Sequence, residues 1–397
     1  MVSSMDRVRN WQGPAVFSYG FRPFFLGAGL WAAVSMVLWI PLLSGHIDIP
    51  TAFDPISWHA HEFLFGYLSA VLAGFLLTAV PNWTGRLPMV GWPLVGLFVL
   101  WVAGRVAVLF GSQLSPGIVV AVDLAMQVAL IAAIAREIVI GKNWRNLIVL
   151  AMATAMAAGN ALFHWEAADG TFAAQGAGLR LGLAAGVMMI AVVGGRIVPS
   201  FTRNWLVKQA AASLPAAPMG MFDRVALIAL LAALIAWVGL PDGTVSGALL
   251  VLAGVLHFVR LIRWKGGKTA AEPLVLILHI GYAFVPLGAV AMAFAILMPD
   301  VLYVADAQHL WMAGGIGIMT IAVMTRATLG HTGQALTAGK GTLLIYGLII
   351  VSVALRFCAG SLPFDGTMLY SLSGLCWILG YMCFVLIYGP RLLRRAK

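Results

Sequence analysis

The sequence predicts an all-helical membrane protein that crosses the bilayer about twelve times. Of its 397 residues, 62% are hydrophobic and only 10% are charged, and the mean hydropathy is +0.97. A soluble domain carries about 25% charged residues, so this composition excludes one. Apolar runs of about 20 residues, enough to cross a hydrocarbon core of about 30 Å, recur along the whole chain. We therefore expect a single transmembrane domain over residues 1–397.

The expected spans are joined by short loops, which leaves no room for a separate soluble domain. They cover residues 24–44, 59–80, 91–112, 117–140, 144–165, 177–199, 222–240, 244–264, 272–297, 307–326, 341–360 and 367–388. The first run is long enough to span the membrane, so we expect no cleavable signal peptide. The three cysteines lie in the last two spans, and no Cys-x-x-Cys-His motif occurs. Covalent attachment of a c-type haem is therefore excluded.

The distribution of charge predicts that both termini are cytoplasmic. With the N-terminus inside, all but three of the 24 Lys and Arg residues fall at inner ends of spans. The inner residues extend from Arg7 and Arg9 near the N-terminus to Arg394, Arg395 and Lys397 at the C-terminus. The three exceptions are Arg105, Arg180 and Arg356. The outer loops instead carry acidic residues such as Asp169, Asp242, Asp306 and Asp365. The positive-inside rule gives the orientation. The net charge of +10 thus indicates topology and contact with the lipid bilayer rather than nucleic-acid binding.

Most of the eight histidines are expected to gather in two groups, one near each membrane face. The outer group is His59, His61, His164 and His309, and the inner group is His257, His279 and His331. Any one of them is also explained as an interfacial histidine bonded to a carbonyl or to water. Two groups among so few polar residues favour function, because an ionisable side chain within a span needs a compensating partner.

Imidazoles on neighbouring helices serve as axial ligands of haem, bind copper or relay protons, and the sequence leaves these roles open. Within span 2, His59 and Glu62 share a helix face, whereas His61 points about 200° away from His59. We expect His59 or His61, together with His309, to hold haem b near the outer face. Glu62 is then a catalytic proton carrier or a hydrogen-bond acceptor for an imidazole. The alternative role of Glu62 is a carboxylate favoured by the helix dipole.

The inner pair is expected to share a cofactor. His257 and His279 each lie seven residues, or about 10 Å, from the short loop that joins spans 8 and 9. This spacing puts both imidazoles at matching depth.

Three inward-running spans end in similar sequence segments, which predicts a four-span unit repeated three times. The segments are "LLTAVPNWTGR", "AVVGGRIVPSFTRNW" and "IAVMTRATLGHTGQ", and 23 residues separate both His61 from Thr84 and His309 from Thr332. Glycine, threonine and arginine are also common where any helix leaves the membrane. The arginines of these segments, Arg86, Arg196, Arg203 and Arg326, suit the propionates of a haem, because guanidinium binds carboxylate in a fixed fork. Anchoring at the inner face explains each arginine equally well.

The motifs "YGFRPFF" at 19–25, "WHAHEFLFGY" at 58–67, "GFLLTAVPNWTGR" at 74–86, "GGRIVPSFTRNW" at 194–205 and "AVMTRATLGHTG" at 322–333 resemble the NnrS family. The resemblance implies a multi-pass protein of the bacterial inner membrane, linked to denitrification and to nitrosative stress through nitric oxide, with haem and copper. The polar residues that match family motifs are His59, His61, Glu62, Arg86, Arg196, Arg203, His309, Arg326 and His331.

A more distant resemblance is to the catalytic subunit of haem–copper oxidases and nitric oxide reductases. In that family spans 2 and 10 supply the axial ligands of the low-spin haem. This chain departs from it because no His-His pair opens span 7 and span 6 has no histidine. We therefore expect a haem protein that binds or turns over nitric oxide, with quinol as a possible electron donor. The alternatives are a histidine-coupled transporter of a metal, haem or small anion, and a sensor with a structural cofactor.

Overall fold

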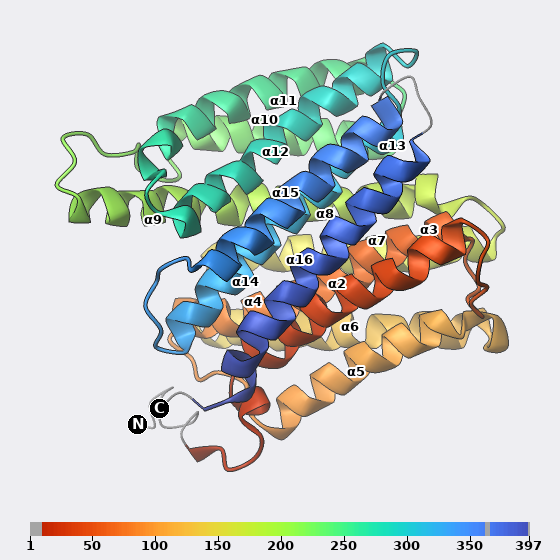
Figure 1. Cartoon of the computed structure of the whole chain (residues 1–397), viewed down its shortest axis with the longest axis horizontal. Coiled ribbons are helices and arrows are strands. Elements are labelled where there is room, and N and C mark those ends of the chain that lie inside the picture. Colours follow the sequence, from red (N-terminus) through yellow and green to blue (C-terminus); the bar gives the residue numbers. More distant parts are fainter. Residues whose placement is uncertain (1–9, 362–365, 396–397) are drawn as a thin grey trace. The chain divides into compact units, whose positions relative to one another are not determined.

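The computed structural model describes residues 10–361 and 366–395. Of the charges used to predict topology, Arg7, Arg9, Asp365 and Lys397 lie outside these residues. The described chain is entirely helix, turn and loop, and it contains twelve helices long and apolar enough to cross a membrane (Figure 1). The expectation of an all-α polytopic membrane protein is confirmed.

Most spans are single helices whose bounds lie within a few residues of those expected. They are α2 (Phe21–Leu43), α5 (Trp92–Leu109), α6 (Pro116–Ile140), α7 (Leu147–Ala168), α10 (Met221–Gly239), α11 (Thr244–Arg263), α12 (Pro273–Leu297), α15 (Lys340–Ser361) and α16 (Thr367–Leu393). Short 3-10 turns flank them: η1 (Ala15–Ser18), η3 (Gly111–Gln113), η4 (Trp144–Asn146), η5 (Ala173–Gln175) and η7 (Gly266–Thr269).

Spans 2, 6 and 10 are each interrupted by a π-helical segment. They are α3 (Pro55–His61), η2 (Glu62–Tyr67) and α4 (Leu68–Thr84); α8 (Ala177–Met189), η6 (Ile190–Gly194) and α9 (Gly195–Lys208); and α13 (Val304–His309), η8 (Leu310–Ile318) and α14 (Met319–His331). These spans are also the most buried, with 83%, 72% and 78% of their apolar windows inside the protein. Because π segments are rare and favour functional sites, their recurrence at every fourth span supports the predicted threefold repeat.

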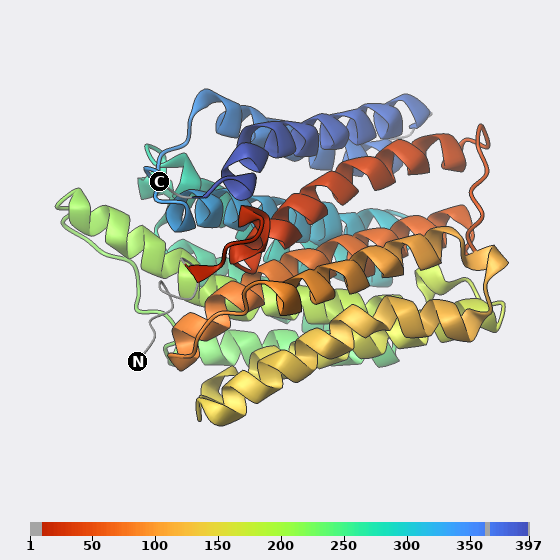
Figure 2. The same cartoon turned by 90° about the horizontal axis from the view of Figure 1, so that it is seen from below.

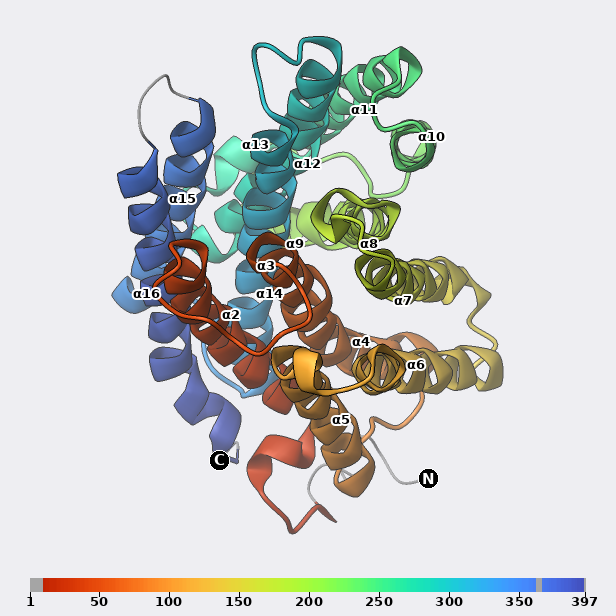
Figure 3. The same ribbon diagram turned by 90° about the vertical axis from the view of Figure 1, so that its right-hand side faces the viewer.

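The chain divides into two compact units. Unit 1 comprises Met1–Gly182, Thr328–Gln334 and Tyr381–Lys397, and unit 2 comprises Leu183–Ala327 and Ala335–Gly380. Within unit 1, α4 packs against α2 and α6, and α5 runs beside α6 (Figure 2). Within unit 2, α10, α11 and α12 are consecutive neighbours, and η8 packs against α12 and α15 (Figure 3). The single transmembrane domain stays a prediction.

The start of span 2, which carries His59 and His61, is fixed by a helix cap. The Asp54 carboxylate accepts hydrogen bonds from the backbone N–H groups of Ile56 and Ser57, both at 3.0 Å. Pro55 occupies the first helical position, where its missing N–H costs nothing.

Both ends of the described chain meet on one side of unit 1. Arg22 donates to the backbone carbonyls of Leu392 and Arg394 at 3.0 and 2.6 Å, and Arg395 donates to the carbonyl of Trp11 at 2.8 Å. An even number of spans requires this arrangement. That the shared side is cytoplasmic remains a prediction.

The three basic residues that depart from the charge rule have structural explanations. Arg105 lies in the buried cluster described below, between two carboxylates. Arg356 donates to the Asp306 carboxylate at 2.8 Å, and Arg180 donates to the backbone carbonyl of Gln175 at an exposed surface. Arg105 and Arg356 are thus neutralised by carboxylates, so they do not oppose the predicted orientation.

Candidate metal centre

A cluster of polar side chains is buried in unit 1, near the predicted outer ends of spans 2 to 5. Its members are His61, Glu62, Arg105, Asp123, Asn160 and His164, each no more than 5% exposed. Buried charge is costly unless it is paired and hydrogen-bonded. The contacts of these side chains therefore decide what the cluster can do.

His61, the last residue of α3, has oxygen atoms at both ring nitrogens. Its Nδ1 lies 3.1 Å from Glu62 Oε1, and its Nε2 lies 2.9 Å from Asn160 Oδ1 and 3.2 Å from Asp123 Oδ2. The amide of Asn160 is oriented by its own donation to Asp123 Oδ2 at 2.8 Å, so its oxygen faces His61. Both imidazole nitrogens therefore donate, which makes His61 an imidazolium in this arrangement.

Arg105 joins the two carboxylates of the cluster. Its Nη1 lies 2.6 and 2.7 Å from the two oxygens of Glu62, and its Nη2 pairs with Asp123 Oδ1. Trp31 donates a further hydrogen bond to Glu62 at 2.7 Å. Two cations, Arg105 and His61, thus balance two anions, Glu62 and Asp123, and the buried cluster is neutral.

The π-helical segment η2 makes room for Arg105. A Cβ on Gly66 would collide with the guanidinium and lie 2.8 Å from Glu62 Oε2, so only glycine fits here. Trp101 donates to the carbonyl of Gly66 at 2.9 Å. The π-helical segment "EFLFGY" thus places its glycine directly against the arginine of the neighbouring helix.

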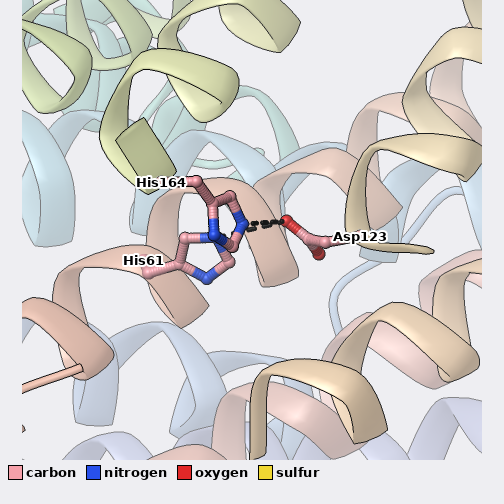
Figure 4. A group of neighbouring side chains, drawn as sticks. All are labelled: His61, Asp123 and His164. Carbon is pink, nitrogen blue, oxygen red and sulfur yellow. Dashed lines mark hydrogen bonds and ion pairs between the residues drawn. The ribbon is translucent and has the colours of Figure 1, made fainter. Parts of the chain in front are cut away.

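Three atoms of the cluster are spaced as ligands of one metal ion. His61, Asp123 and His164 each offer one ligand atom, these three atoms lie within 4.8 Å of one another, and both imidazoles lie beside the Asp123 carboxylate (Figure 4). Each nitrogen is 3.1 to 3.2 Å from that oxygen. Imidazole and carboxylate bind zinc at about 2.0–2.2 Å, which puts two ligands of one ion roughly 3–3.5 Å apart. Two imidazoles and a carboxylate suit iron, copper or zinc, so the donor set fits a transition metal.

The model of the NnrS protein family matches residues 15–395, which is nearly the whole chain. The chain belongs to the NnrS family. A comparison with curated proteins gave no match. Family membership agrees with the resemblance seen in the motifs, and it connects the metal-binding geometry to a family for which haem and copper were expected.

Two residues of this NnrS site, Asp123 and Asn160, were missed in the sequence, and His164 had no assigned role. Asp123 carried a readable signal, because it is a carboxylate two turns inside an apolar span. Asn160 carried none, since a neutral amide in a span is common at helix contacts. Glu62 was expected beside His59, and the structure places its carboxylate 3.1 Å from Nδ1 of His61.

The predicted haem ligands His59 and His309 belong to different units, His59 to unit 1 and His309 to unit 2. His59 is half-buried and stacks on Trp39 with ring centroids 4.1 Å apart. His309 Nδ1 lies 2.6 Å from the carbonyl of Ala305, so it carries the proton and leaves the lone pair on Nε2. Ligating histidines use this tautomer. Whether His309 and one span 2 histidine hold haem stays a prediction.

The inner histidine His257 belongs to a second buried network, in unit 2. Its Nδ1 lies 2.8 Å from the hydroxyl of Tyr282, and its Nε2 donates to the carbonyl of Ala226 at 3.1 Å. Arg260 donates to the same hydroxyl at 2.7 Å and to Asp223 at 2.6 Å. The hydroxyl therefore donates to His257, whose two ring nitrogens are both satisfied by the protein.

His279 has different partners. Its Nε2 lies 2.7 Å from the hydroxyl of Thr202, which itself donates to the carbonyl of Val198, so Nε2 carries the proton. Its Nδ1 is buried without a hydrogen-bond partner. Trp264 lies against both His279 and Tyr282, with centroids 6.4 and 4.5 Å away. A cofactor shared by His257 and His279 stays a prediction.

The remaining predicted residues lie in, or two residues after, the last helix of spans 2, 6 and 10. His331 stacks on Tyr19 at 5.7 Å, in unit 1. Arg86 pairs with Glu137 at 2.9 Å and is 40% exposed. In unit 2, Arg326 lies over the ring of Phe201 at 4.3 Å, Arg196 is half-buried and Arg203 is exposed. Their role toward haem propionates stays a prediction.

Proposed function

We propose that this chain is a bacterial inner-membrane protein of the nitric oxide response, and that it holds copper at His61, Asp123 and His164. The observation that carries the proposal is the buried triad of donor atoms within 4.8 Å of one another. Glu62 lies at the other ring nitrogen of His61. A carboxylate in this position, which does not itself bind the metal, commonly orients a ligating histidine. When bound, copper would supply a redox-active centre able to take nitric oxide as ligand or substrate.

The charge of the cluster favours a monovalent ion. Its two cations and two anions balance when His61 carries a proton on Nε2, the nitrogen that would bind the metal. A monovalent cation that replaces this proton leaves the net charge unchanged, whereas a divalent cation adds an uncompensated buried charge. Copper meets the charge requirement because it is monovalent when reduced, and it also binds imidazole readily. His164 needs only to move its proton to Nδ1, which costs no charge.

Haem b is the second cofactor we propose, on His309 and on His59 or His61. The support is the tautomer of His309, whose Nδ1 is held by the carbonyl of Ala305. A role of Arg86, Arg196, Arg203 and Arg326 toward propionates would require a haem at the predicted inner side, because a hydrocarbon core of about 30 Å separates that side from the outer ends of spans 2 and 10. Because His61 is engaged in the polar cluster, His59 is the better span 2 candidate for this haem. Electrons for turnover would come from a membrane donor such as quinol.

The test is the copper content of the full-length protein purified in detergent, measured by mass spectrometry. His164→Ala and Asp123→Asn should lose copper, because each removes one donor. The matched control His46→Ala removes an exposed loop histidine and should keep it. Glu62→Gln should weaken copper binding by about 10–100-fold, as mutation of residues that orient a ligand does. Full copper content in both His164→Ala and Asp123→Asn would overturn the proposal.

A histidine-coupled transporter of a metal, haem or small anion is the competing function. The observation in its favour is that His61 donates to two carboxylate-bearing neighbours, as a proton carrier within a span would. The visible spectrum separates the two functions. A Soret band that shifts with nitric oxide supports the haem protein, and a colourless protein that moves substrate into proteoliposomes supports the transporter.

A further inference from the structure

A small pocket lies beside His164 at the predicted outer end of unit 1. Its volume is about 50 Å³, and the ends of α5 and α7, the start of α6 and the loop before α3 line it. Exposed Ala52, Pro116 and Ala168 form its mouth, and buried Val119 and His164 form its floor. His164 is the one titratable residue among the lining side chains. The pocket therefore leads from the surface to a proposed metal ligand.

The wall of this pocket is held by hydrogen bonds. Ser112 donates to the carbonyl of Pro50 through both its backbone N–H and its hydroxyl, at 3.0 and 2.9 Å. A Cβ on Gly111 would lie 3.2 Å from the backbone nitrogen of Ala52, so glycine permits the close approach of the loop. The loop that closes one side of the pocket is thus fixed to the end of α5.

Phe53 covers both imidazoles of the metal triad. Its ring centroid lies 5.1 Å from that of His61 and 5.3 Å from that of His164, and Phe53 also lines the pocket. Asp54, the cap of α3, follows it directly and fixes the chain at this point. Phe53 therefore lines the pocket and also lies against the imidazole of His61.

We propose that this pocket is the access route and binding subsite for a small uncharged molecule of two or three heavy atoms, such as nitric oxide, and that Phe53 limits its size. The inference deepens the proposed function, on which its metal depends. The pocket volume is several times the 10–15 Å³ that one water molecule requires, so a diatomic molecule fits. Its mainly apolar walls disfavour ions, because they offer no partners for a charge.

The first experiment tests the pocket without any metal. Crystals of the full-length protein are pressurised with xenon, a small apolar probe that occupies cavities of this kind. We expect xenon beside His164, and none in Ala167→Leu, whose larger side chain fills the half-buried lining position. Ala158→Leu, on the exposed face of the same helix, should keep the xenon. Absence of xenon from the wild type, or its persistence in Ala167→Leu, would overturn the proposal.

The second experiment measures how fast nitric oxide binds to the copper-loaded protein, by stopped-flow absorbance. Ala167→Leu should slow binding by about tenfold, equivalent to a barrier of about 1.4 kcal/mol, while Ala158→Leu leaves the rate unchanged. Phe53→Ala should admit larger ligands such as isocyanides, which the wild type excludes. Equal rates in all variants would reject the route. A wild type that takes xenon but holds no copper would instead refute the proposed function and leave the pocket standing.

Discussion

Replacement of Arg105 by methionine tests whether the buried cluster is held together by charge. The variant keeps most of the side-chain volume but leaves Glu62 and Asp123, both about 1% to 4% exposed, with His61 as their single cation. Removal of one partner from a buried ion pair destabilises proteins by about 3–5 kcal/mol, because the remaining charge is uncompensated. Because Arg105 pairs with two carboxylates, we expect the free energy of unfolding to fall by at least this amount.

The assay is unfolding of the metal-free full-length protein in mixed micelles by titration with sodium dodecyl sulfate, followed by tryptophan fluorescence. The double variant Arg105→Met with Glu62→Gln removes one charge of each sign and should be about 1–3 kcal/mol more stable than Arg105→Met alone. The control Arg86→Met breaks the partly exposed pair with Glu137 and should cost no more than about 1 kcal/mol. If Arg105→Met costs no more than Arg86→Met, the assignment of a charge-balanced cluster is refuted.

Two further predictions concern topology and Gly195, the residue that follows the π-helical segment η6. Reporter fusions at Asp169, Asp242 and Asp306 should be periplasmic and those at Lys208, Lys268 and the C-terminus cytoplasmic, because the basic residues gather at one side; a periplasmic C-terminus would contradict the orientation. Gly195→Ala should destabilise the protein by about 1–3 kcal/mol, since the new Cβ would lie 2.7 Å from Cζ of Arg260. The control Gly96→Ala, whose Cβ meets no atom within 4 Å, should be neutral or stabilising. If Gly195→Ala and Gly96→Ala have equal effects in the micelle assay, a tight contact at Gly195 is contradicted.

The sequence predicted the number and position of the spans because hydropathy and length suffice for a helix in a bilayer. The sequence underestimated the lengths of spans 2, 6 and 10, whose helices have 30, 32 and 28 residues. An apolar run marks the membrane-embedded part, whereas α9 continues to Lys208 as a helix with exposed polar residues. The π-helical segments were also not predicted, because no apolar or polar periodicity in the sequence distinguishes them from α-helix.

The site was predicted in part for similar reasons. His61 and Glu62 stood out because ionisable residues at a span are costly. Arg105 appeared only as an exception to the charge rule, and Asp123 was passed over, although the two balance each other. A search for intramembrane residues of opposite sign would have paired them. The partner role of Asn160 depends on the packing of α7 near α3 and α6, which no local pattern encodes.

The π-helical segments also restrict how neighbouring helices can move. In the bilayer no hydrophobic force holds one helix at a given height beside another. Here Trp101 reaches the main-chain carbonyl of Gly66 in span 2, and Arg260 reaches that of Ala191 in span 6 at 2.9 Å. A slide of α5 or α11 by one helical turn would break these bonds and leave a main-chain group unsatisfied. Spans 2 and 6 are thereby each held in register with a neighbouring helix, so a sliding motion of α5 or α11 along them would cost free energy.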